Sequence, residues 1–420
     1  MLFRSLAALR KEVEPVEPSV FARFLPTWHG ITHPRRGIDA LVGAIEQLQG
    51  VAIPASILEQ SVLPARVLDY QPKMLDELCA AGELVWIGAG PLGDDGRVRL
   101  LFRDQVRSHH GLRAPAEFEF TAMHNTIVDR LATSGASFWY DLLAACESPP
   151  EPKLLQALWD LVWAGYLTND TFAPVRAPRA HPKRASSSTK RARPQVGRLT
   201  RLGPAAGAGR WSLVAPLLEP APSPTEVAHT TALALIERHG VVTREAVMHE
   251  GTPGGFAGVY PVLKALEEAG KVRRGWFVAG LGAAQFAMSG AVERLRTLSG
   301  TDDGRAPIVL AAADPAQPYG AALSWPEHLG GRAARNAGAF VVMEDGELVA
   351  FVERGGRSML SYAVPASNDW IAALIDARRV GRVGSLQLQH IDGGSARESV
   401  LADRLRTAGF VDGYKGLILR

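Results

Sequence analysis

The sequence is poor in cysteine and in long apolar runs. Cys79 and Cys146 are the only cysteines among 420 residues, too few for a disulfide framework or for a zinc site of four thiolates. No run of 18 or more apolar residues occurs, and the opening residues hold only a brief apolar stretch with charges inside it, which argues against a spanning helix and an ordinary export signal. These absences predict a cytoplasmic protein without a membrane partner.

Carboxylates are absent between Asp170 and Glu219, where ten basic residues fall. The formal net charge of the whole chain is only +3, so the remainder is net acidic. Segment 177–222 is also rich in serine, proline and alanine, a composition that cannot bury a core and that predicts a basic linker. It is either a solvated tether or a tether that contacts phosphates. The candidates for phosphate contact in it are Lys183, Arg184, Lys190, Arg191 and Arg193.

A repeated pattern organises the rest of the chain, whose length predicts two to four domains. Four times a helical apolar pattern ends in Ala-Gly and passes into a short strand-like run. Glycine just past a helix can adopt the left-handed conformation that satisfies the last carbonyls. A helix, a glycine stop and a hairpin, preceded by two more helical stretches, is the outline of a winged helix. The four glycines are Gly82, Gly165, Gly270 and Gly409.

The pattern predicts three tandem winged helices, at 31–112, 113–176 and 223–300. Residues 1–30 begin with a helical pattern that has no capping residue before it, so we expect them to be the helical remnant of a longer protein.

The last segment, 301–420, changes to the period of two that is typical of strands. Its strand-like runs surround a hairpin tip at Asp345-Gly346 and are followed by a helical pattern at 366–381. We expect a small β-barrel here, covered by that helix, with a terminal helix–strand unit. The predicted fold class is therefore α+β and multidomain, with tandem winged-helix modules followed by a small β-barrel.

The third winged helix carries the features expected of a DNA contact. Gly254 and Gly255 precede its third helix, where backbone N–H groups can face a phosphate oxygen. On its predicted wing, Arg273 and Arg274 would reach the nucleic-acid backbone, and the nearby Trp276 would wedge or stack. The alternative is a tight interhelical turn and a solvated hairpin. The candidates for DNA binding here are Gly254, Gly255, Lys271, Arg273, Arg274 and Trp276.

Histidines and other tryptophans are weaker candidates. The adjacent pair His109-His110 and the more distant His124 lack a nearby cysteine, which favours a solvated loop over a metal site. Trp86, Trp159 and Trp163 lie in periodic apolar runs, which favours a place in the core.

Three runs of sequence resemble the large helicase-related (Lhr) family: Pro253–Ala287, Val62–Gly88 and Asp403–Arg420. The resemblance implies an ATP-dependent, superfamily-2 translocase that moves 3′ to 5′ on DNA and RNA–DNA hybrids and acts in DNA repair, with this chain as its C-terminal region. The sequence contains no G-x-x-x-x-G-K-[ST] loop. ATP and magnesium are therefore expected to belong to the N-terminal helicase core of the same protein, and no cofactor is expected here.

That region of the family is in turn similar to the winged-helix DNA glycosylases that unhook crosslinks, which use a Gln-apolar-Gln motif. Where the motif would align, this sequence has Gly50–Pro54, without either polar residue. A second such motif, Gln387-Leu-Gln389, precedes Asp392. These residues are candidates for a strand-borne catalytic site with Asp392 as general base, although a half-exposed strand ending in a turn gives the same pattern.

The resulting hypothesis is an accessory region that binds DNA or an RNA–DNA hybrid, assembles the helicase, or does both, in a nucleoid-associated protein. Two alternatives remain: a glycosylase-like domain that processes lesions, and a module that only forms homo-oligomers. Whether this chain is itself an enzyme is left open.

Overall fold

The computed structural model describes residues 14–112, 118–177, 203–282, 284–300 and 306–419, which form two compact units. The first unit comprises the chain through Leu48, then Ser56–Tyr70, and then Pro224 onward. The second comprises Gln49–Ala55 and Gln71–Ser223, and the short helix α4 (Ala55–Ile57) lies where the chain passes between them. The predicted linker residues Lys183, Arg184, Lys190, Arg191 and Arg193 lie outside the described residues.

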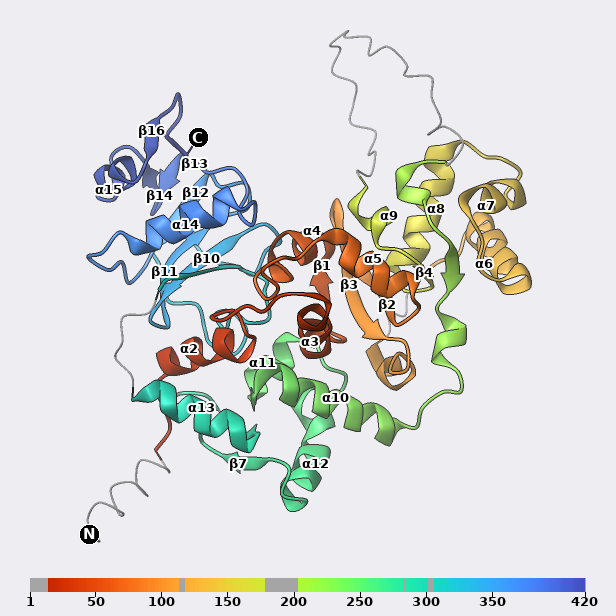
Figure 1. Ribbon diagram of the computed structural model, residues 1–420, viewed down its shortest axis with the longest axis horizontal. Coiled ribbons are helices and arrows are strands. Elements are labelled where there is room, and N and C mark those ends of the chain that lie inside the picture. The colour runs from red at the N-terminus through yellow and green to blue at the C-terminus, as the bar shows by residue number, and fades with distance from the viewer. Residues whose placement is uncertain (1–13, 113–117, 178–202, 283, 301–305, 420) are drawn as a thin grey trace. The chain divides into compact units, whose positions relative to one another are not determined.

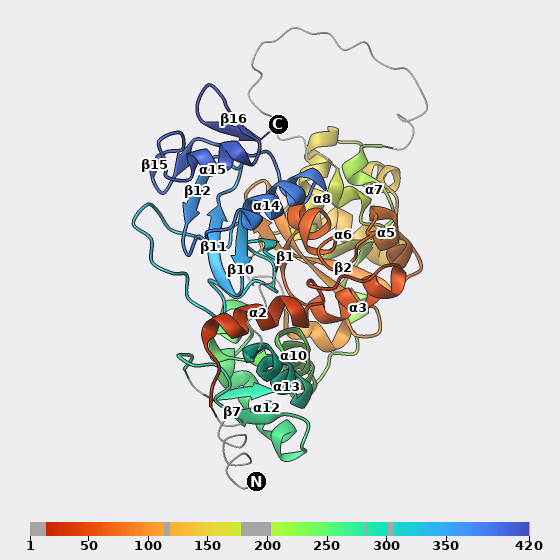
Figure 2. The same ribbon diagram turned by 60° about the vertical axis from the view of Figure 1, so that its left-hand side comes forward.

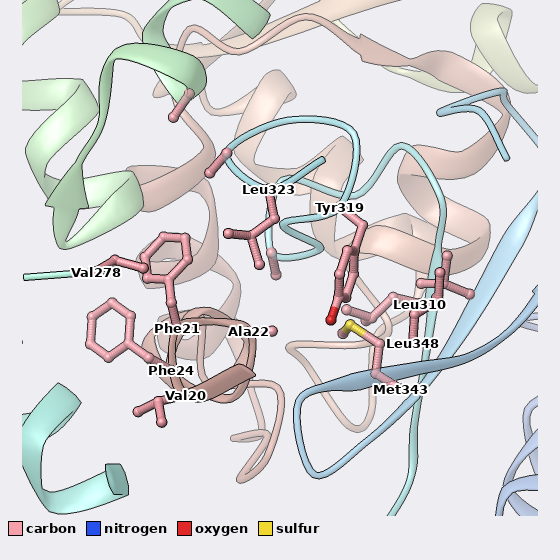
Figure 3. Close-up of a cluster of buried hydrophobic side chains, with 14 of the residues drawn as sticks. Val20, Phe21, Ala22, Phe24, Val278, Leu310, Tyr319, Leu323, Met343 and Leu348 are labelled. Atoms are coloured by element: carbon pink, nitrogen blue, oxygen red, sulfur yellow. The ribbon is translucent and has the colours of Figure 1, made fainter. Parts of the chain in front are cut away.

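Helix α2 (Pro18–Trp28) organises the main core of the first unit. Proline occupies its first position, where the fixed φ angle of proline matches that of a helix and its missing N–H is not needed. Figure 3 shows its residues Phe21 and Phe24 facing Val278, within a cluster that also takes in Tyr319 and Met343. Helix α13 (Ser289–Ser299) packs on α2, as Figure 1 shows. Two other elements of this unit are α3 (Ile38–Leu48) and the π-helical turn η1 (Leu58–Val62).

A three-helix module with a small antiparallel sheet follows in the same unit. Its strand order is β6-β8-β7, and its core gathers residues of the helices around the buried Phe286. This is the helix–hairpin outline that the sequence predicted for the third winged helix. Its elements are α10 (Pro224–His239), β6 (Val241–Val242), α11 (Arg244–His249), α12 (Gly255–Glu268), β7 (Arg273–Gly275) and β8 (Gln285–Ala287).

A six-stranded sheet follows, with strand order β15-β14-β12-β11-β10-β9. Asp345 and Gly346 form the tight turn between β10 and β11, both with positive φ, as predicted from the Asp-Gly pair. Helix α14 (Asp369–Arg379) packs on β9 and β10, and Figure 2 shows it lying against this sheet. Its residue Trp370 is buried. The strands are β9 (Ile308–Ala311), β10 (Phe340–Glu344), β11 (Glu347–Val352), β12 (Ser358–Ser361), β14 (His390–Ile391) and β15 (Gly394–Ser395).

This sheet is open, with β15 and β9 as its edges among the described residues, so the predicted barrel is not confirmed. The terminal helix–strand part instead forms a separate three-stranded sheet of order β13-β17-β16. Its elements are β13 (Gln387–Leu388), α15 (Ala402–Thr407), β16 (Phe410–Asp412) and β17 (Leu417–Leu419).

The second unit packs helices against two small antiparallel sheets, β1-β3-β2 and β4-β5. Its core contains edge-to-face indoles: Trp211 lies 6.3 Å from Trp86 and 5.9 Å from Trp159 between ring centroids, and the indole N–H of Trp86 donates to the carbonyl of Thr171. The elements are β1 (Ile53–Pro54), α5 (Pro72–Ala80), β2 (Leu84–Leu92), β3 (Asp95–Phe102), η2 (Arg107–Leu112), α6 (Ala122–Ser134), α7 (Trp139–Ala145), α8 (Glu151–Trp163), β4 (Leu167–Asn169), α9 (Ala173–Arg176), η4 (Ala205–Gly207), β5 (Trp211–Leu213) and η5 (Ala215–Leu218).

The four predicted glycine stops are confirmed. Each glycine has positive φ and lies two residues after the last residue of a helix, so each occupies the left-handed position that ends the helix and leads into the next strand. The φ values are 77° at Gly82, 79° at Gly165, 69° at Gly270 and 110° at Gly409.

Candidate nucleic-acid interface

The predicted contact residues lie at the two ends of α12: Gly254 and Gly255 at its start, and Lys271 to Trp276 after its end, on and around β7. Gly270 ends the helix region and lets the chain turn back at once into β7. Strand β7 pairs with β8, with Arg274 opposite the buried Phe286. We call the β7–β8 hairpin the wing. Its strand β8 is buried in the core, whereas β7 faces solvent.

All four predicted wing residues, Lys271, Arg273, Arg274 and Trp276, are exposed. Lys271 and Arg273 are solvent-facing, and the indole of Trp276 is 69% exposed. Such an exposed indole beside two cations is the combination that stacks on bases while cations meet the phosphates.

Arg274 has a different environment from its neighbour. Its guanidinium lies 3.2 Å from the carboxylate of Glu267 and donates to the hydroxyl of Tyr260, both on α12. These contacts raise the pKa of Arg274 and hold the wing strand against the helix. The structure therefore gives Arg274 a positioning contact that the sequence pattern did not reveal.

Gly254 and Gly255 lie at the start of α12, as predicted, with φ of 72° and 58°. The N–H of Gly255 donates to the carbonyl of Thr252, and the N–H of Gly258 donates to that of Gly254. The two glycines thus build a tight turn into the helix, which uses the N–H of Gly255 internally.

The Gln387 and Gln389 side chains do not share one strand. Gln387 belongs to β13 and pairs with Ile418 of β17, whereas Gln389 lies past the end of β13, and its N–H donates to the carbonyl of Arg357. The chain changes sheets at this point, because β14 joins the six-stranded sheet by pairing in parallel with β12. The expected single strand carrying both amides is therefore wrong.

Asp392 occupies the turn between β14 and β15, with φ of 54°. Its carboxylate accepts hydrogen bonds from the N–H and the hydroxyl of Ser361, at 2.7 and 2.6 Å, and lies 3.1 Å from Nε2 of His328. The Nδ1 atom of His328 accepts from the N–H of Gly330, which leaves Nε2 to carry the proton toward Asp392. The hydroxyl of Tyr362, whose ring contacts His328, is buried without a hydrogen-bond partner in the described part of the chain.

Sequence reasoning missed His328 and Ser361. They lie 64 and 31 residues from Asp392 and share no spacing motif with it. The parallel pairing of β12 with β14 brings Ser361 to Asp392, whereas His328 reaches it from the loop between β9 and β10. We call Asp392, His328 and Ser361 the Asp392 cluster.

The remaining candidates are structural. Trp86, Trp159 and Trp163 are buried, as predicted. His124 caps α6 through Thr121 and lies 3.6 Å from Asp160. Within the described ranges, no group of three or more histidine, cysteine, aspartate or glutamate side chains is placed to hold a metal ion. Nor do those ranges include a helix with the length and apolar character needed to cross a bilayer.

Comparisons with known proteins agree on one family. Residues 16–103 and 221–307 match the domain described as large helicase-related protein, winged-helix domain. The chain is 45% identical over 445 aligned positions to Lhr helicase/probable uracil glycosylase of Mycolicibacterium smegmatis and 34% identical over 453 positions to Lhr helicase/uracil glycosylase of Escherichia coli. Each alignment covers 99% of this chain but only 29% of the relative.

The fold also resembles a solved structure, the DNA glycosylase AlkZ of Streptomyces sahachiroi. The TM-score is 0.53 over 90% of this chain and 100% of that one, at 14% identity. At that identity the likeness concerns the fold alone.

Proposed function

We propose that this chain is the nucleic-acid-binding region of a large helicase-related protein, because residues 16–103 and 221–307 match the winged-helix domain of that family. The chain covers less than a third of the length of each curated relative that it matches. The ATP-driven motor, with its magnesium, would belong to the part of the protein that this chain does not span, and the chain would hold DNA or an RNA–DNA hybrid for that motor.

The wing carries this proposal. Lys271 and Arg273 are exposed beside Trp276 on a hairpin that follows directly on the third helix of its module. In winged-helix proteins of this outline, cations on exposed elements neutralise phosphates, a sequence-independent and salt-dependent contribution to affinity. Because Arg274 is held by Glu267 and Tyr260, we assign the phosphate contacts to Lys271 and Arg273.

Charge reversal tests the proposal. The variant Lys271→Glu/Arg273→Glu should bind a labelled duplex more weakly, and the slope of log affinity against log salt should become shallower by about 2, or about 0.9 for each phosphate that is no longer neutralised. Arg354→Glu/Arg357→Glu is the matched control, since both arginines are exposed on the β11–β12 hairpin and the change in net charge is the same. Equal effects of the two double variants in fluorescence anisotropy would contradict a contact through the wing.

A second candidate function is excision of uracil from DNA. The names of both relatives include a uracil glycosylase, and the Asp392 cluster holds a carboxylate against a histidine and a serine in the partly exposed turn between β14 and β15. Asp392 would accept the proton of a water that attacks the sugar carbon of a flipped nucleotide while uracil leaves as an anion.

The test of this second candidate is uracil release from a labelled single-stranded oligonucleotide. Asp392→Asn should abolish release, whereas Asp376→Asn, at an exposed carboxylate of α14, should not change it. Release that survives in Asp392→Asn would remove Asp392 from the reaction.

Light scattering of the same samples tests the remaining alternative, self-assembly. A multimeric mass without any salt-sensitive DNA binding would favour self-assembly over both proposed functions.

A further inference from the structure

A small cavity of about 220 Å³ lies beside the wing, between strand β7, helix α13 and the segment Glu14–Val16. We call it the wing cavity. At about 30 Å³ for each water molecule in the liquid, its volume corresponds to about seven waters, which suits a single nucleobase ring and not a base pair. Its size therefore admits one group as large as a base and excludes a base pair.

The backbone that forms one wall of the wing cavity is fixed on two sides. Val16 pairs in parallel with Val278: its N–H donates to the carbonyl of Phe277, and its carbonyl accepts from the N–H of Ala279, both at 2.8 Å. On the other side, the fully buried side chain of Gln285 accepts from the N–H groups of Phe277 and Val278 and donates to the carbonyl of Val278, each at 2.9 Å. This wall is preorganised, so binding a ligand against it would not require the backbone to be ordered first.

The opposite wall comes from one face of α13. Val292, Leu295 and Arg296 are spaced three and four residues apart and therefore share a side of the helix. Val292 and Leu295 are buried, and Arg296 lies at the partly exposed border. The cavity thus has an apolar base with a guanidinium at its edge.

Its exposed edge holds the groups that recognise a nucleotide. Trp276, which is 69% exposed, borders the cavity together with Glu14 and Arg296, while the Arg274 guanidinium lies against Glu267 and Tyr260 of α12. An indole stacks on the face of any base, guanidinium groups pair with phosphate oxygens, and a carboxylate accepts a hydrogen bond from an exocyclic amino group such as that of cytosine. One ligand combines a flat ring, an amino group and an adjacent phosphate, and that ligand is a nucleotide.

We propose that the wing cavity binds one unpaired, amino-bearing base of a nucleic-acid strand, stacked on Trp276, with Glu14 at its amino group and Arg296 beside its phosphate. The proposal rests on the function proposed above and deepens it. The wing then distinguishes a strand with an unpaired nucleotide from a fully paired duplex, through contacts separate from those of Lys271 and Arg273.

The experiment compares a blunt duplex with the same duplex carrying a single-stranded tail of dC or of dT, by fluorescence anisotropy with the whole 420-residue chain. The unmodified protein should prefer the dC-tailed duplex over the blunt one. Trp276→Ala should reduce this preference by about 10-fold, the order expected for one base stacked on an aromatic ring. Tyr414→Ala is the matched control, because Tyr414 is a 93% exposed aromatic residue on another hairpin, and it should leave the preference unchanged.

Two further readouts address the base itself. A single 2-aminopurine in the tail should lose fluorescence on binding to the unmodified protein and to Tyr414→Ala, but not to Trp276→Ala. Glu14→Ala should bring the ratio of affinities for dC and dT tails toward one. Removal of a negative charge strengthens binding to both tails alike, and this general effect cancels in the ratio of the two affinities.

The outcomes separate the two proposals. Equal weakening of tailed and blunt DNA by Trp276→Ala, with salt-sensitive binding that still depends on Lys271 and Arg273, would overturn the cavity proposal alone. Absence of binding to every oligonucleotide would overturn both. Because Trp276 and Glu14 are exposed, unchanged thermal unfolding of each variant confirms that the fold is retained.

Discussion

Arg66 and Asp314 form a two-pronged ion pair deep inside the first unit. The two terminal nitrogens of Arg66 donate to the two carboxylate oxygens of Asp314, at 2.8 and 2.9 Å, and the side chains are only 2% and 1% exposed. The residues are 248 positions apart in sequence. Arg66 follows η1, and Asp314 follows β9, so the pair joins the N-terminal part of the unit to its large sheet.

Removal of one member of this pair should be strongly destabilising. Asp314→Ala leaves the Arg66 guanidinium buried without its counter-charge, and the expected loss is about 3–5 kcal/mol of unfolding free energy. The double variant Arg66→Met/Asp314→Leu should lose less than Asp314→Ala, because it removes the Arg66 charge together with its partner. The partly buried Arg335 and Arg382 lose the nearby Asp314 charge equally in both proteins. Urea denaturation of the three proteins, followed through the transition of the first unit, measures both. A double variant at least as unstable as Asp314→Ala would contradict the argument.

The neighbouring His29 makes stability depend on pH. His29 is 3% exposed, and its Nδ1 atom accepts from Arg66. Burial, and then the charges of Arg66 and other cations nearby, hold the pKa of His29 well below its ordinary value of 6.5. Below pH 6.5 the unfolded chain therefore takes up a proton that the folded protein refuses, and stability falls as pH falls, by up to about 1.4 kcal/mol per pH unit. Above pH 6.5 this contribution is constant.

The measurement is the urea midpoint at pH 7.5, 6.5 and 5.5. His29→Asn should flatten the decline below pH 6.5, whereas the same change at the exposed His33 should not. His249 acts in the same direction, because partial desolvation and the charge of Arg335 lower its pKa to about 4, so a smaller slope should survive in His29→Asn. A slope that is identical in the two variants would exclude His29 as a source.

The β10–β11 turn requires glycine at position 346 for two reasons: the backbone there is left-handed, and a Cβ atom would collide with helix α2. Gly346 has φ of 83°, and a Cβ there would lie 2.0 Å from the carbonyl oxygen of Ser19, a backbone atom of α2. Gly355 has φ of 89°, with no atom within 4 Å of the same position. Gly355→Ala should therefore cost only the left-handed conformation, about 1–2 kcal/mol, and Gly346→Ala clearly more. Thermal unfolding of the two variants makes the comparison, and equal losses would mean that α2 moves freely aside.

Local patterns in the sequence predicted the local structure well. The left-handed glycines, the Asp345-Gly346 turn and the apolar face of α14 depend on residues a few positions apart, where periodicity and turn chemistry are informative. The buried places of Trp86, Trp159 and Trp163 also follow from such runs. The family could be inferred for the same reason, because its resemblance lies in continuous runs.

Contacts between distant residues could not be predicted in this way. The parallel pairing of β12 with β14 draws His390 beside Ser358 and ends the strand that Gln387 was expected to share with Gln389. The same pairing brings Ser361 to Asp392. In the main core of the first unit, Val16 pairs with Val278. Each of these contacts joins elements that are far apart in the sequence, separated by a sheet crossover or by a whole module. Such contacts leave no regular residue spacing from which they could be predicted.

In the second unit, Asp76 of α5 is the anchor for the segment that leads into α9. Its carboxylate accepts from the hydroxyl of Thr171 and the N–H of Phe172, at 2.7 and 2.8 Å, and from the guanidinium of Arg176 at 2.6 Å. Partial burial raises the pKa of Asp76, but these three donors more than offset it, so that the pKa is lowered from its ordinary value of 3.8. The ionised form is therefore the one that the fold stabilises.

Asp76→Asn should lower the stability of the second unit by about 1.5–3 kcal/mol, the range for hydrogen bonds to a charged group. An amide has one oxygen in place of two and turns its NH₂ group toward a donor. Asp129→Asn, at an exposed position of α6 in the same unit, is the control and should change little. Since the folded-state pKa lies below 3.8, the contribution of Asp76 is present above that pH and is lost as pH falls further. Urea unfolding at pH 7 and pH 3 should therefore show a smaller difference between Asp76→Asn and the unmodified protein at pH 3, and a difference that stays constant would contradict this role of the carboxylate.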